Sequence, residues 1–137
     1  MEQALVEYIL KQHLEADAWM AANPGSWMGK LVDPSDTEYW TQRVPSGTLK
    51  EYQRIELEED AYYTIAEAYS KSYARAHDFS TMTDAELMAE IESASQVITR
   101  EIESEKAEKA AEEARLEKLA TSLDVDRETL ERWMEAA

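Results

Sequence analysis

The chain has 137 residues, no cysteine, and 30 Asp and Glu residues against 14 Lys and Arg residues, which gives a net charge of −16. The absence of cysteine excludes disulfides, thiol catalysis and cysteine-ligated zinc. A charge of this sign opposes contact with nucleic acid and with anionic membranes, and it favours basic protein surfaces as partners.

The length predicts a single globular unit that can bury a core. Apolar residues make up 44% of the chain, which argues against general disorder. No apolar run approaches the ~20 residues of a membrane span. The N-terminus lacks the basic region and apolar core of a secretory signal. We therefore expect a cytoplasmic protein.

The N-terminal third predicts one helix followed by an irregular segment. Residues 2–22 carry apolar side chains at helical spacing, among them Leu5 and Ile9. The apolar face is wide, so we expect this helix to be well buried. Asn23-Pro24-Gly25 ends it. The apolar residues of 26–32 are expected to fold back over the core.

A short helix and a second long helix are expected next. Asp33 is the predicted N-cap of the short helix, Pro34 its first residue, and it runs through Trp40. The second long helix is predicted over Thr48–His77, with a stripe rich in tyrosine and with Ser46 or Thr48 as its cap.

The longest predicted helix spans Thr83–Leu123. Thr83 and Glu86 form a capping box at its start, and an apolar stripe runs from Leu87 to Ile102. Because the preceding connection is short, the two long helices are expected to be antiparallel neighbours, with the N-terminal helix across them.

The apolar stripe of this helix ends at Ile102. Residues 103–115 offer only alanine as apolar side chains, so we expect this stretch to project into solvent or into a partner; disorder in the free chain is the alternative. Residues 116–134 predict a terminal helical hairpin. The expected fold is all-α, a small helical bundle with a long C-terminal helix, divided into a core (1–102) and an acidic extension (103–137).

No pattern of residues predicts catalysis or a cofactor. A di-metal carboxylate bundle needs Glu three residues before His, but Leu10 precedes His13 and Ala74 precedes His77 at that spacing. No nucleophile elbow and no glycine-rich phosphate loop is present. We therefore expect neither an enzyme nor a bound metal.

The C-terminal residues Leu119 to Trp133 resemble the helix-turn-helix of many bacterial regulators. A valine, Val125, closes the turn, and Asp124 stands where that motif normally has glycine. The resemblance implies a helical hairpin of that shape. DNA binding is the weaker implication, because the second helix carries more acids than bases and a groove-reading helix needs positive charge.

The chain as a whole is similar in size, charge and helix content to phage-encoded DNA mimics such as the Ocr-type antirestriction proteins. In that group, carboxylates on helices stand in for phosphates and occupy a host DNA-binding groove. The resemblance implies a basic, nucleic-acid-binding host protein as partner, with no direct contact to nucleic acid or membrane. The candidate partner-binding acids are Glu56, Glu58, Glu59, Asp60, Glu101, Glu105, Glu108, Glu112, Glu113 and Glu117.

Two function classes therefore stand side by side. One is the acidic inhibitor that mimics DNA, and the other is a structural or regulatory helical assembly module, for which a homodimer is left open. Mimicry requires acids gathered on one face of a helix, whereas an assembly helix shows acids and bases mixed all round.

Overall fold

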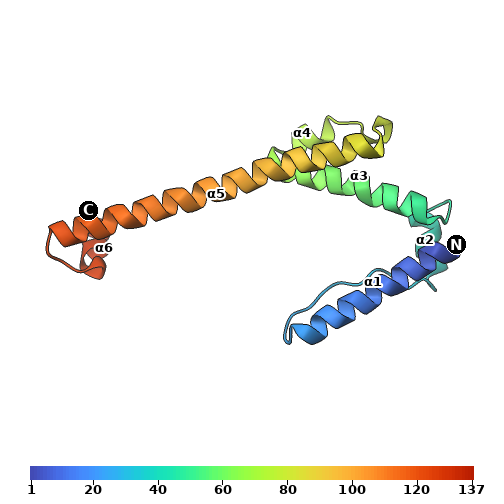
Figure 1. Cartoon of the computed structure of the whole chain (residues 1–137), viewed down its shortest axis with the longest axis horizontal. Coiled ribbons are helices and arrows are strands. Elements are labelled where there is room, and N and C mark those ends of the chain that lie inside the picture. Colours follow the sequence, from blue (N-terminus) through green and yellow to red (C-terminus); the bar gives the residue numbers. More distant parts are fainter.

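The computed structural model describes all 137 residues as six α-helices and one 3-10 turn, without strands (Figure 1). The all-α prediction, with one long helix near the C-terminus, is confirmed. In chain order, the elements are α1 (Gln3–Ala22), α2 (Thr37–Arg43), α3 (Leu49–Ala68), α4 (Lys71–Arg75), η1 (Phe79–Thr81), α5 (Asp84–Ser122) and α6 (Arg127–Ala136).

Side-chain caps fix where the two longest internal helices begin. The Thr48 hydroxyl accepts the amide of Glu51 at the start of α3. At the start of α5, Thr83 Oγ1 accepts the amide of Glu86, and Glu86 Oε1 accepts the amide of Thr83. The predicted capping box is thus confirmed, and such a cap stabilises a helix by about 1 kcal/mol.

The N-terminal core joins α1, α2 and the start of α3. Its buried members are Leu5, Ile9, Trp40, Val44 and Tyr52. The Trp40 indole N–H donates to the carbonyl oxygens of residues 32 (3.2 Å) and 33 (3.0 Å). These bonds hold the end of the segment that follows α1, where Leu31 and Val32 pack against the core. The predicted fold-back of 26–32 is therefore confirmed only at its end, because Trp27 and Met28 are exposed.

The expectation that α1 is well buried across both long helices is wrong. Only Leu5, Ile9 and Ala16 of this helix are buried, while Leu10 and Leu14 are exposed. α1 packs on the start of α3 and then diverges from α3 and α5 (Figure 1). An apolar pattern gives the width of a helix face, but it does not tell how many neighbours cover that face.

Asp33 does not cap a helix, contrary to the prediction. Its carboxylate accepts the amide of Ser35 (2.8 Å) in a tight turn. Hydrogen bonds from the side chain and the backbone amide of Ser35 lower the pKa of Asp33. Asp36 is the N-cap of α2 instead, because its Oδ1 accepts the amide of Tyr39 at 3.1 Å. Two residues, Ser35 and Asp36, thus separate the Asp33-Pro34 pair from the first residue of the helix.

The single helix predicted over Thr48–His77 is broken after Ala68. Tyr69 leaves the helical region (φ −124°, ψ −83°), and Ser70 starts α4 by accepting the amide of Tyr73 on its hydroxyl. The apolar rhythm continues through the break, and neither Gly nor Pro marks it. Periodicity therefore could not reveal it.

Because of this break, α3 and α5 run parallel, and the prediction of antiparallel neighbours is wrong. At the start of both helices, Arg54 Nη1 lies 2.6 Å from Asp84 Oδ1. At the other end, Ile65 of α3 packs in one cluster with Ala94 of α5. α4 and η1 form the return connection that brings the chain back (Figure 1).

α5 continues far beyond the end of α3. Its 39 residues correspond to about 58 Å. Residues 99–115, named the bare segment below, are exposed at every position, and they extend over about 25 Å. The segment joins the α3–α5 core to the terminal hairpin, so the predicted projection is observed, while the domain boundary at 102/103 stays a prediction.

The accessible surface is large for the mass of the chain. It measures 9889 Å², whereas a globular monomer of 15.7 kDa exposes about 7,300 Å². Only 15 of the 137 residues are buried. The excess exceeds the ~800 Å² that each partner contributes to a standard protein interface.

Candidate interaction site

The acids predicted on α3 are mostly engaged within the fold. Glu59 forms a two-pronged ion pair with Arg43 (2.6 and 2.9 Å), and the hydrogen bonds from Arg43 lower its pKa. Glu58 pairs with Arg54 at 3.6 Å. Asp60 accepts the hydroxyl of residue 64 at 3.2 Å. These carboxylates therefore stabilise α3 and its neighbours.

Glu56, the fourth acid of this group, is half-buried and accepts the Tyr52 hydroxyl at 2.5 Å. Tyr52 itself is 2% exposed. Burial raises the pKa of Tyr52 far above 10, and the hydrogen bond to Glu56 raises it further. The phenol is thus held neutral in the folded state.

This pair predicts a loss of stability in alkali. Below pH 10, Tyr52 is neutral in both the folded and unfolded chain, so its contribution is fully present. Above pH 10 the phenol ionises only in the unfolded chain, and the free energy of unfolding falls as pH rises. Urea unfolding between pH 8 and pH 11 measures this, and Tyr52→Phe should reduce the slope. An unchanged slope in that variant would contradict the assignment.

The predicted acids near the end of α5 are also paired. Arg115 donates to Glu112 at 2.8 and 3.0 Å. Arg127 reaches back from α6 to Glu113 (2.8 and 3.0 Å) and Glu117 (3.0 Å). Hydrogen bonds from these arginines lower the pKa values of Glu112 and Glu113. The acids closest to α6 therefore serve to hold the hairpin.

Glu101, Glu105 and Glu108 remain without an ion pair. The two predicted groups of acids do not merge into one patch. The α3 group lies beside the start of α5, as the Arg54 contact with Asp84 shows, and Glu101 lies about 25 Å farther along the helix.

Around the bare segment, acids and bases alternate. It carries six acids and four bases, the latter being Arg100, Lys106, Lys109 and Arg115. At 100° per residue, the bases point in several directions between the acids. One narrower pattern remains, because four acids fall within an arc of about 60°, namely Glu101, Glu105, Glu108 and Glu112.

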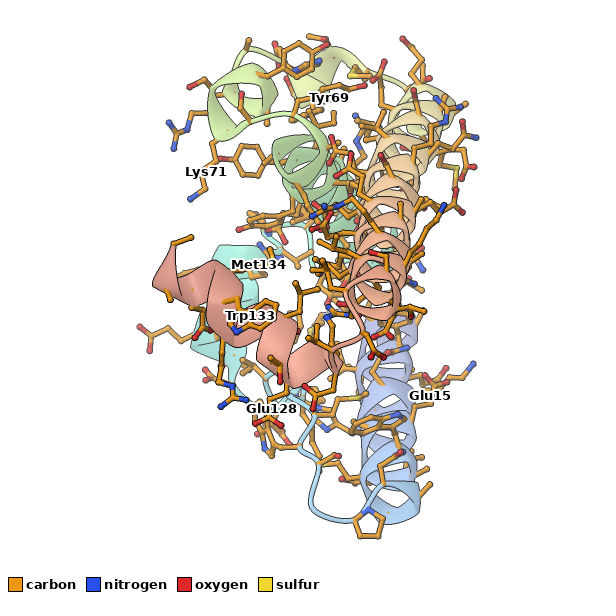
Figure 2. All side chains as sticks on the ribbon, turned by 90° about the vertical axis from the view of Figure 1, so that its left-hand side faces the viewer. Glu15, Tyr69, Lys71, Glu128, Trp133 and Met134 are labelled. Atoms are coloured by element: carbon orange, nitrogen blue, oxygen red, sulfur yellow. The ribbon has the colours of Figure 1, made fainter.

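The terminal hairpin has the predicted shape. Leu116 and Ala120 of α5 bury Leu130 of α6, with Val125 of the turn beside them. Figure 2 looks onto the end of α5 and shows α6 extending sideways from it. The apolar face of α6 therefore reaches past the edge of α5.

Asp124 occupies the position that usually requires glycine. Its φ of +54° lies in the left-handed region. The amide of Asp124 donates to the carbonyl oxygen of Thr121, and the amide of Val125 donates to the carbonyl oxygen of Ala120 at 3.1 Å. This pair of bonds forms a Schellman motif, in which a residue with a Cβ carries a steric cost.

Asp124→Gly should therefore stabilise the hairpin, by about 0.5–1 kcal/mol, because relief of the left-handed strain outweighs the added chain entropy. The change is measured by thermal unfolding followed by circular dichroism, or by the hydrogen-exchange rates of the α6 amides. Asp126→Gly is the opposite control, since Asp126 caps α6 through the amide of Thr129 (2.7 Å) and its loss should destabilise. Faster exchange in Asp124→Gly would refute the strain argument.

Sequence reasoning missed a set of exposed apolar side chains at the two ends of the bare segment. Trp133 is 54% exposed and Met134 is 48% exposed, on the outer part of α6 (Figure 2). Leu123 at the end of α5 and Ile102 at the other end of the segment are also about half exposed. The spacing of Leu130, Trp133 and Met134 places all three on one face of α6, and this apolar face could have been read from the sequence. Only Leu130 of the three is buried in the hairpin.

No family model, curated protein or solved structure matches this chain. None of the helices combines the length and the hydropathy of a membrane-spanning segment. No three His, Asp or Glu side chains gather as a metal-binding set.

Proposed function

We propose that this protein is a helical interaction module that binds a protein partner along the bare segment of α5 and the exposed face of α6. The observation that carries the proposal is the exposure of every residue from 99 to 115 on a helix that is anchored by packed clusters at both ends. Because this helix is already formed in the free chain, binding does not require the full loss of conformational entropy that folding it would cost.

Three further features support it. The surface excess leaves room for a standard interface. Exposed apolar side chains lie near the start of the segment, at Ile102, and beyond its end, at Trp133, where buried anchors of an interface could form. Acids and bases alternate between them, which suits a partner helix of mixed charge. No catalytic role is part of the proposal.

The test is affinity capture from a bacterial lysate with the full chain as bait, washed at low and then at high salt. A module with apolar anchors should retain its partner at high salt, because salt screens exposed charges and leaves apolar contacts intact. Release of every captured protein by moderate salt would count against this function.

The second candidate is the phage-type inhibitor that occupies a basic groove of a nucleic-acid-handling host protein in the cytoplasm. The arc of Glu101, Glu105 and Glu108, which lack internal ion pairs, favours it. It requires that duplex DNA release the captured protein and that affinity fall steeply with salt. Replacing these three acids by glutamine should then weaken binding about tenfold or more. The matched control replaces Glu2, Glu67 and Glu90, three exposed acids outside the bare segment.

A further inference from the structure

The terminal hairpin is a small packed unit of its own. Its core buries three side chains, Leu116 and Ala120 of α5 and Leu130 of α6. None of them belongs to the two clusters of buried residues nearer the N-terminus. The bare segment, in which no residue is buried, separates the hairpin from the α3–α5 core (Figure 1). Such a small core leaves much of the attachment of α6 to other contacts.

Arg127, the first residue of α6, supplies those contacts. Its Nη1 lies 2.8 Å from Glu113 and 3.0 Å from Glu117, and its Nη2 lies 3.0 Å from the second oxygen of Glu113. Its Nε lies 3.1 Å from Glu131 of α6. No other base of the chain pairs with three carboxylates. An isolated surface ion pair contributes little to stability, but a two-pronged arginine in a network of carboxylates is the arrangement that does contribute.

The same arginine also acts on α5 itself. Glu113 and Glu117 are four residues apart, so they lie on one face of α5 and repel each other. One guanidinium bridges both carboxylates, and its hydrogen bonds lower the pKa of Glu113. Docking of α6 therefore removes a repulsion that would otherwise weaken α5 at this point.

The bare segment has little of its own to keep it helical. Its one internal ion pair joins Arg115 to Glu112 at 2.8 Å, and a pair at this spacing stabilises a helix only weakly. Glu101 repels Glu105, and Glu108 repels Glu112, because each pair is four residues apart. An isolated helix of about 15 residues is marginal in water. The order of the segment therefore depends on its two ends, of which one is packed against α3 and the other is held by the hairpin.

We propose that Arg127 is a latch through which the docking of α6 keeps the outer half of α5 helical. When α6 undocks, Glu113 and Glu117 lose their shared cation and the buried side chains of α5 lose their cover. α5 then unwinds from its C-terminal end toward the end of α3, so the hairpin and the bare segment open as one unit. The inference concerns the free chain, so it does not depend on the function proposed above.

The experiment compares amide hydrogen exchange in the full wild-type chain and in Arg127→Ala. The variant should exchange at least fivefold faster over α6 and also over 104–122, while residues 87–98, which pack against α3, should keep their rates. Acceleration confined to α6 would show that Arg127 fixes only its own helix, and it would overturn the proposal. Unchanged rates in both regions, or equal acceleration over 87–98, would also refute it.

Two further variants sharpen the test. Arg115→Ala is the matched control, because it removes an arginine and an ion pair from the bare segment without a contact to α6, and it should change the rates less than twofold. Arg127→Lys keeps the charge and loses the fork of the guanidinium, so its rates should lie between those of wild type and Arg127→Ala in α6 and in 104–122 alike. Intermediate rates in α6 together with wild-type rates over 104–122 would contradict the coupling.

Discussion

Replacing Trp133 and Met134 together by alanine is expected to weaken binding of the captured partner at least 30-fold. Both side chains lie on the part of α6 that α5 does not cover, and each is about half exposed in the free chain. Burial of a tryptophan at an interface commonly contributes 2 kcal/mol or more, which corresponds to that factor. The measurement is a titration of the purified partner with wild type and variant.

The variant should remain folded, because Leu130 and not Trp133 supplies the buried contact of the hairpin. The matched control is Leu10→Ala with Leu14→Ala, which removes two exposed apolar side chains from α1. This control should bind like wild type. Equal loss in both double variants would mean that the apolar surface acts without regard to position.

Trp40→Ala is expected to lower the free energy of unfolding by about 3–5 kcal/mol. Trp40 is 3% exposed, packs edge-on against Tyr52 with ring centroids 5.5 Å apart, and binds two carbonyl oxygens through its indole. It is the only buried residue of α2 and links that helix to α1 and α3. Since small proteins have a total stability of about 5–15 kcal/mol, this variant should lose a large share of its stability.

Trp40→Phe separates packing from hydrogen bonding. It keeps most of the buried ring and loses the indole donor, so the expected cost is about 1–2 kcal/mol. Urea unfolding followed by far-ultraviolet circular dichroism measures both variants. A cost below 1 kcal/mol for Trp40→Ala would show that the N-terminal core does not depend on this side chain.

The sequence allowed most helices to be placed, because their ends carry local chemistry. The Thr83–Glu86 capping box and the Thr48 cap depend on residues three apart, and such signals can be read without tertiary structure. The break at Ser70 could not be read in this way. The apolar rhythm passes through it, so the parallel arrangement of α3 and α5 was predicted as antiparallel.

The candidate site was only partly predictable for a related reason. The exposure of 103–115 follows from its lack of large apolar residues, and it was foreseen. The engagement of Glu113 by Arg127 requires that the hairpin first bring α6 beside α5, fourteen residues back along the chain. A count of acids therefore overstated how many carboxylates face outward.

The most direct test of the central claim is hydrogen exchange of the full chain with and without its captured partner. In the free chain, amides of 99–115 should exchange faster than those of 87–98, which are packed against α3. Binding should slow exchange over 99–115 and over α6, and leave α1 unchanged. Protection confined to α1 and α2, with the bare segment as fast as before, would contradict the account.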